Sequence, residues 1–104
     1  MNIIGQFYLK KTSNGNLVGE WSNNDQNKVF SESCDLITAG NDSYVGEYNS
    51  TWQEKGEAIF AKLTITRKTN NSPLFSLKWQ GKGFGFEGDG MLCDDVLMGR
   101  FQEI

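Results

Sequence analysis

Carboxylates are the side chains of this chain that could most readily transfer protons or hold a cation. Glu87 and Asp89 stand two residues apart in the segment GFGFEGDGMLCDD, which ends in Asp94-Asp95. Paired carboxylates of this kind can do acid–base work or bind a divalent ion. In an alternating strand, Glu87 and Asp89 fall on the face opposite the phenylalanines and point to solvent, although a shift of one residue would turn both inward. The pattern favours solvated carboxylates, and a carboxylate-dependent enzyme is the weakest of the functions considered.

The cysteines offer little further chemistry. Cys34 and Cys93 are the two cysteines of the chain, and histidine is absent. Nucleophilic catalysis by cysteine needs a group that lowers the thiol pKa, and no histidine is present to do so. A four-ligand zinc site would need carboxylates to complete it. We therefore expect two reduced thiols, no cofactor, no metal and no enzymatic activity.

The distribution of charge excludes some classes of partner. The net charge is -3, and the ten Lys and Arg residues are scattered along the chain. Nucleic-acid binding requires a concentrated basic surface, so it is not expected. The apolar runs are too short to span a membrane as a helix. Residues 1–6 have no basic segment or cleavage motif of a secretory signal, and the expected location is cytoplasmic.

The elements that position these residues are strands. In the last third of the chain, Phe84, Phe86, Gly88, Gly90 and Leu92 fall on alternate positions. After the Asp94-Asp95 break, residues 97–101 alternate in the same way. A period of two interrupted by a turn predicts two antiparallel strands, each with one buried face.

The same rhythm recurs earlier in the chain, where Asn14-Gly15 gives a strong hairpin signal. Further strands are predicted over residues 3–10, 17–21, 44–52, 59–66 and 75–80. A helix over 54–63 has some compositional support, but the alternation and the β-branched residues 64–66 favour a strand. The signal is weakest over 28–38, which could form one irregular strand, two short pieces, or a one-turn helix at 33–37. Residues 39–42 are expected to end that segment.

Seven clear strands and a possible eighth, joined by short turns, predict a single all-β domain over residues 1–104. We expect an antiparallel up-and-down β-barrel of seven to eight strands. Closure requires the strand at 97–101 to pair with the strand at 3–9. If it does not, an open sandwich replaces the barrel.

Glycine and an aromatic ring recur two residues apart on the same strand face. The four examples are Gly5-Gln6-Phe7, Gly19-Glu20-Trp21, Gly46-Glu47-Tyr48 and Gly99-Arg100-Phe101. Glycine makes room for a neighbouring ring and allows the bend that closure of a small barrel needs. This interpretation is favoured over the alternative, in which the glycines line a ligand pocket.

These motifs resemble the opening strands of the calycin-type barrels, the lipocalins and avidins. The segment Gly15-Asn16-Leu17-Val18-Gly19-Glu20-Trp21 is similar to the second strand of avidins. The resemblance implies a calycin-like barrel, and the ligand of those families does not carry over. It does not imply biotin, because Phe7 replaces the usual Trp and residues 8–11 lack the Asn and Ser that bind biotin in avidins. Arg100 could pack across an aromatic ring at a barrel end, as in lipocalins, or be solvated.

A small-ligand-binding barrel is the leading functional hypothesis. Aromatic rings and a few hydroxyl groups on inner faces are typical of a small-molecule site, so we expect a small apolar or aromatic ligand at one barrel end. The residues expected to line this site are Tyr44, Tyr48, Ser50, Trp52 and Trp79.

The alternative is a filled barrel that acts as a protein-interaction or structural domain. Outward apolar residues would then form the contact surface: Ile4, Tyr8, Val18, Val45, Phe60, Val96 and Met98. Their number makes a homo-oligomer plausible under either hypothesis.

Overall fold

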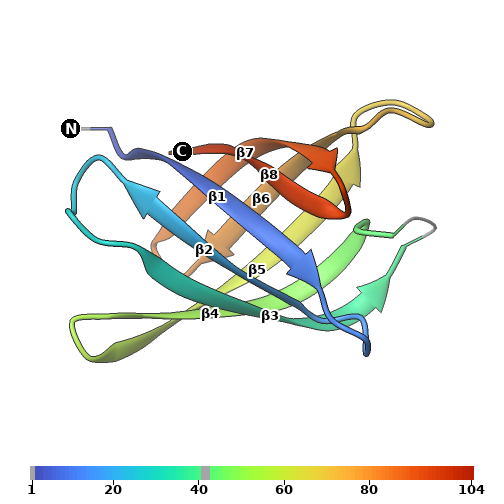
Figure 1. Ribbon diagram of the computed structural model, residues 1–104. Helices are drawn as coiled ribbons and strands as arrows, with labels where there is room; N and C mark the ends of the chain where they lie inside the picture. The colour runs from blue at the N-terminus through green and yellow to red at the C-terminus, as the bar shows by residue number, and fades with distance from the viewer. Residues whose placement is uncertain (1, 41–42) are drawn as a thin grey trace.

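The protein forms a closed barrel of eight antiparallel strands (Figure 1). The computed structural model describes residues 2–40 and 43–104. Every regular element within those ranges is a strand, and none of the described residues belongs to a helix that could cross a membrane. The strands are β1 (Ile4–Lys11), β2 (Leu17–Asn23), β3 (Phe30–Ala39), β4 (Gly46–Glu54), β5 (Glu57–Arg67), β6 (Leu74–Gly81), β7 (Phe84–Cys93) and β8 (Val96–Glu103).

Each strand pairs with its neighbours in the sequence, and β8 pairs with β1 to close the barrel. The closing register places Phe7 opposite Gly99 and Leu9 opposite Leu97. This pairing confirms the predicted up-and-down barrel and excludes the open sandwich. The amide of Glu103 donates a 2.9 Å hydrogen bond to the carbonyl of Ile3, so the two ends of the chain lie together at one end of the barrel.

The segment with the weakest strand signal is a full strand. β3 pairs with β2 and β4, with an irregular register between Leu36 and Thr38. The one-turn helix at residues 33–37 is therefore wrong, because the backbone groups of this segment bond to both neighbouring strands. The predicted end at residues 39–42 includes positions 41 and 42, which lie outside the described residues.

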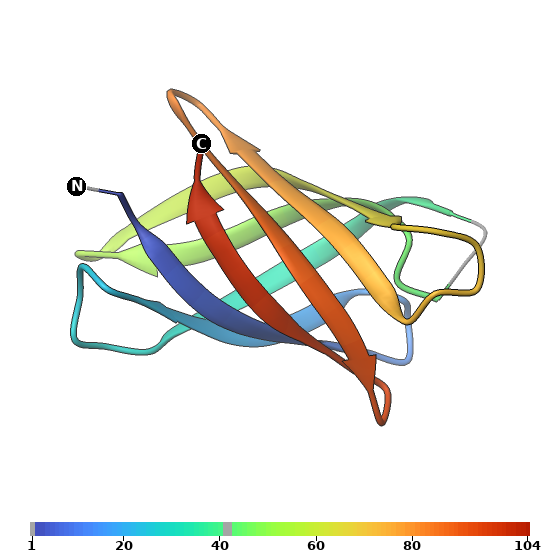
Figure 2. The ribbon, with the colours of Figure 1, turned by 90° about the horizontal axis from the view of Figure 1, so that it is seen from above.

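Glycines allow the strands to approach closely where the sheet bends. A Cβ atom on Gly19 would lie 1.8 Å from the carbonyl oxygen of Tyr8, and one on Gly99 would lie 1.8 Å from that of Asp89. Such contacts leave room for hydrogen alone. They support the interpretation that glycines in the Gly-x-aromatic units serve closure. Figure 2 shows the resulting tilt of the strands across the barrel.

One half of the barrel interior is filled with side chains. Five residues that project into it have no exposed surface: Leu9, Leu17, Leu63, Phe75 and Leu97. At this end the Arg67 guanidinium lies 4.7 Å from the centre of the Phe75 ring, and it donates a hydrogen bond to the carbonyl of Ser72. A cation over an aromatic ring thus closes the filled end. The cation is Arg67, whereas Arg100 is exposed on the outer face.

Candidate functional site

A cavity of about 340 Å³ opens at the other end of the barrel. This is the end at which β1, β3, β5 and β7 begin, and at which β2, β4, β6 and β8 finish. The volume falls within the range of small-molecule sites. Seven aromatic side chains from six strands line it: Phe7, Trp21, Trp52, Trp79, Phe84, Phe86 and Phe101.

The rings hold one another in fixed orientations. Trp21 stacks on Phe30 with a centroid distance of 4.4 Å and meets Trp52 edge to face at 5.8 Å. On the opposite wall, Trp79 meets Phe7 edge to face at 5.4 Å. Edge-to-face and stacked pairs are favourable beyond the area that they bury. The aromatic wall is consequently ordered before any ligand enters.

Glu32 forms the polar floor of the cavity. Its side chain points into the barrel from β3, and the residue is only 4% exposed. Oε2 accepts hydrogen bonds from Ser50 Oγ of β4, from Trp79 Nε1 of β6 at 2.8 Å, and from Cys34 Sγ at 3.5 Å. Within residues 2–40 and 43–104, all hydrogen bonds of this carboxyl group fall on Oε2. Oε1 therefore retains its capacity to bind a partner.

Two opposing effects act on the protonation of Glu32. Burial raises the pKa of the Glu32 carboxyl above its ordinary value, while the hydrogen bonds from Ser50, Trp79 and Cys34 act in the opposite direction. Burial also raises the pKa of the Cys34 thiol, and the negative charge of Glu32 adds to this effect. Cys34 is thus held as a thiol that donates to Glu32, a state unsuited to nucleophilic attack.

The cavity also contains an unpaired donor. Trp52 is 7% exposed and lines the cavity, and its buried Nε1 has no hydrogen-bond partner among the residues that the structure describes. An unsatisfied buried N–H group costs about 1–3 kcal/mol. Buried indole nitrogens usually find a partner, so this N–H, which lies beneath the surface of the cavity wall, is a donor that an external acceptor could reach once the Trp52 ring moves to expose it.

The rim carries negative charge. Asp25, Glu54 and Glu103 line the cavity together with Glu32, and none of the described lining residues is a Lys or Arg. The rim is ordered by local hydrogen bonds. Asn23 Oδ1 accepts from the amides of Asp25 and Gln26, and Glu103 Oε1 accepts from the amide of Ile3 at 2.6 Å.

The structure divides the five predicted site residues between the two ends of the barrel. Trp52 and Trp79 line the cavity, and Ser50 lies beneath it, bonded to Glu32. Tyr44 and Tyr48 are buried in the filled half instead. The Tyr44 hydroxyl donates to the carbonyl of Asp95 at 2.7 Å, and that of Tyr48 donates to the carbonyl of Tyr44 at 2.9 Å. All five point inward as predicted, but only three belong to one site.

The sequence analysis missed Glu32, the polar residue of the site, and five of the seven rings that line the cavity. The signal that could have revealed Glu32 is the alternation Phe30-Glu32-Cys34-Leu36, in which an acidic residue occupies one position of an otherwise apolar face. A buried carboxylate is rare, and an unpaired one rarer. Such a residue on an inner face is therefore an indication of function.

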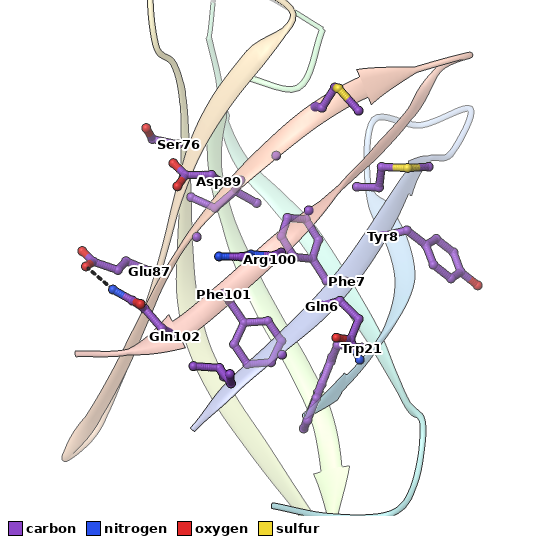
Figure 3. A pocket seen from close by; sticks show the side chains of 18 of the residues that line it. Gln6, Phe7, Tyr8, Trp21, Ser76, Glu87, Asp89, Arg100, Phe101 and Gln102 are labelled. Atoms are coloured by element: carbon purple, nitrogen blue, oxygen red, sulfur yellow. Dashed lines mark hydrogen bonds between the residues drawn. The ribbon is translucent and has the colours of Figure 1, made fainter. Parts of the chain in front are cut away.

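The paired carboxylates of β7 lie outside the barrel, as predicted. Glu87 accepts a hydrogen bond from Gln102 at 3.5 Å, and Asp89 forms a 2.6 Å ion pair with Lys68. Both face a broad hollow on the outer surface of the sheet, where Figure 3 shows them beside Arg100 and Gln102. Glu87, Asp89 and their partners Gln102 and Lys68 are exposed, so neither interaction involves a buried polar group. The inner cavity is accordingly the stronger candidate site.

Comparison with models of known protein families, with curated proteins and with solved structures finds no match. The cavity itself is consequently the basis on which a function can be assigned.

Proposed function

We propose that this protein is a non-enzymatic, calycin-like barrel that binds a small apolar or aromatic molecule at its open end. The observation that carries the proposal is a ring-lined cavity of about 340 Å³ whose wall holds the unpartnered indole N–H of Trp52. A cavity with apolar walls and a few directed polar groups is the usual form of a small-molecule site. The filled-barrel alternative is disfavoured because only one half of the interior is packed solid.

The polar groups support binding over catalysis. Cys34 is a buried thiol with a raised pKa, and Glu32 is held by three donors on one oxygen. The groups that the described residues place beside this carboxyl are the Cys34 thiol, the Ser50 hydroxyl and the Trp79 indole, and all three donate to the same oxygen. The geometry suits recognition of a ligand more than turnover of a substrate.

The test is calorimetric titration with a panel of small aromatic and alicyclic molecules, supported by tryptophan fluorescence. All three tryptophans of the chain line the cavity, so their emission reports directly on its contents. The variant Ile59→Trp places a larger side chain at the cavity wall and should abolish binding. Its control is Phe60→Trp, the next residue, which is 67% exposed on the outer face. Equal binding by the two variants would place the ligand elsewhere, and no binding by the wild type would refute the proposal.

Self-association is a second candidate property, compatible with the first. Apolar side chains occupy adjacent positions on four neighbouring strands: Leu74 on β6, Met91 on β7, Met98 on β8 and Tyr8 on β1. The first three are exposed. This row of apolar side chains suits a contact with a second copy of the chain. Light scattering tests it. We expect an oligomer for the wild type and a monomer for Met98→Glu, whereas a monomeric wild type at high concentration would refute it.

A further inference from the structure

The charges and donors of the open-end cavity are specific enough to indicate the chemical class of ligand. We propose that the ligand is an organic cation, an amine or quaternary ammonium carried on an aromatic or apolar body, whose charge is recognised by Glu32 and whose body is enclosed by the tryptophan rings. This inference rests on the proposed function, since it names the class of molecule that the cavity accepts.

The negative charge of the cavity lining favours a cationic ligand. Four carboxyl groups line the cavity, on Glu32, Asp25, Glu54 and Glu103, and no basic side chain does so among the residues that the structure describes. The chain as a whole has ten Lys and Arg residues and thirteen acidic ones. The absence of Lys and Arg from the lining is therefore a property of the cavity and not of the overall composition. Among the lining side chains, an anionic ligand such as a fatty acid would meet only like charge; Lys28, with Nζ 5.1 Å from the centre of the Phe30 ring, is not one of the lining residues. A cation would be attracted into the mouth and stabilised at its floor.

The aromatic wall of the cavity also favours a cationic ligand. Trp21, Trp52 and Trp79 present indole groups to the cavity from three strands. Indole faces are the strongest cation–π partners among protein side chains, and aromatic cages of this kind bind ammonium groups. Phenylalanine rings from β7 and β8 complete an apolar enclosure suited to the body of the ligand.

Two hydrogen-bonding groups of the cavity, Glu32 Oε1 and Trp52 Nε1, have no partner among the described residues. Oε1 of Glu32 can accept a bond from an ammonium N–H, because the bonds from Ser50, Trp79 and Cys34 all fall on Oε2. The N–H of Trp52 requires an acceptor, which an amine in its charged form cannot supply. The best-matched ligand therefore carries a hydroxyl, ether or carbonyl oxygen in addition to its ammonium group.

A matched series of probes separates charge from shape. Tyramine has an ammonium group, a phenyl ring and a hydroxyl. Tyrosol replaces the ammonium with a neutral hydroxyl, 3-(4-hydroxyphenyl)propionate replaces it with a carboxylate, and phenethylamine lacks the ring hydroxyl. Calorimetry should show tyramine binding about tenfold or more tightly than tyrosol, with no binding of the carboxylate. Choline and tetramethylammonium extend the series to quaternary cations.

Substitutions test which residues produce the preference for cationic ligands. Glu32→Gln keeps the shape of the side chain and removes its charge, and it should reduce the preference for tyramine over tyrosol to about twofold or less. Trp52→Phe should weaken tyramine more than phenethylamine, because only the former has the ring hydroxyl. Glu87→Gln, on the outer face, should change neither comparison. Far-UV circular dichroism and thermal melting verify that each variant is folded.

The outcomes distinguish this inference from the proposed function. If neutral aromatic molecules bind as tightly as their cationic analogues, or if Glu32→Gln leaves the preference intact, the inference is overturned while the ligand-binding function stands. If neither cations nor neutral members of the panel bind, both are overturned. Selective binding of the cations that is lost in Glu32→Gln supports both.

Discussion

The indole Nε1 of Trp79 donates a 2.8 Å hydrogen bond to Oε2 of Glu32, joining β6 to β3 across the inside of the barrel. The two strands are not neighbours in the sheet, so this bond links opposite walls. It separates the filled half of the interior from the open cavity, and it fixes both the carboxyl group and one indole wall of the candidate site. The buried polar cluster thus supports the fold and forms part of the candidate site.

The Glu32–Trp79 bond should be measurable as a coupling free energy. Removing either partner leaves the other buried and less satisfied, which costs about 1–3 kcal/mol for a bond to a charged or partly charged group. We expect Trp79→Phe and Glu32→Leu, which removes the acceptor oxygens, each to lower the free energy of unfolding, and the double variant to lose less than the sum. Urea unfolding of the four proteins in a double-mutant cycle gives the coupling. Strict additivity would show that the two groups do not interact.

The raised pKa of Glu32 predicts a particular dependence of stability on pH. The folded protein holds the Glu32 proton more tightly than the unfolded chain, whose carboxyl titrates near its ordinary value of 4.5. Its contribution to stability is therefore fully present below that value and is lost as pH rises through the folded pKa. Relative to wild type, Glu32→Gln should become more stable as pH increases from about 4 to about 8.

Urea unfolding at several pH values over this range tests the Glu32 prediction, and Glu87→Gln controls for the loss of one surface charge. A constant difference between wild type and Glu32→Gln would contradict it, because the carboxyl would then have the same pKa in both states.

The inner face of the barrel could be predicted from the sequence to a large extent. Alternation of residue type placed Phe7, Trp21, Trp52 and Trp79 inside, and it anticipated the pairing of the last strand with the first. Alternation works here because side chains of a strand point to opposite faces with a period of two. In a barrel with one buried face, a shift of one residue would expose the entire core.

Two features of the site could not be predicted in this way. β3 was indistinct because its inner face includes Glu32, which interrupts the apolar pattern that marks a strand. The alternation of residue types also does not predict how far along the barrel axis a residue lies. Tyr48 and Trp52 lie on the same face of β4, yet one reaches the filled half and the other the cavity. Alternation assigns a side to each residue, whereas depth depends on strand tilt and on the register of all neighbours.

Closure of the barrel through glycine can be tested by adding one methyl group. Gly99→Ala would place a Cβ atom 1.8 Å from the backbone oxygen of Asp89, which can move only if β7 and β8 separate. We expect a loss of about 2–3 kcal/mol in the free energy of unfolding. In Gly85→Ala the nearest atom is the side-chain oxygen of Gln80, at 3.2 Å, which can rotate away. That variant should be close to wild type, and similar losses for both would contradict the steric account.

The central claim, that the open end of the barrel takes a small molecule, is tested most directly by the indole N–H signals in a two-dimensional ¹H–¹⁵N spectrum. The chain has three tryptophans and hence three such signals, and assignment follows from the single Trp→Phe variants. On titration with tyramine and the wider panel, the Trp52 N–H signal should shift strongly as it gains an acceptor, while Phe60→Trp adds a fourth, outer signal that stays in place. If no member of the panel moves the Trp52 signal, the cavity does not bind such ligands and the account is wrong.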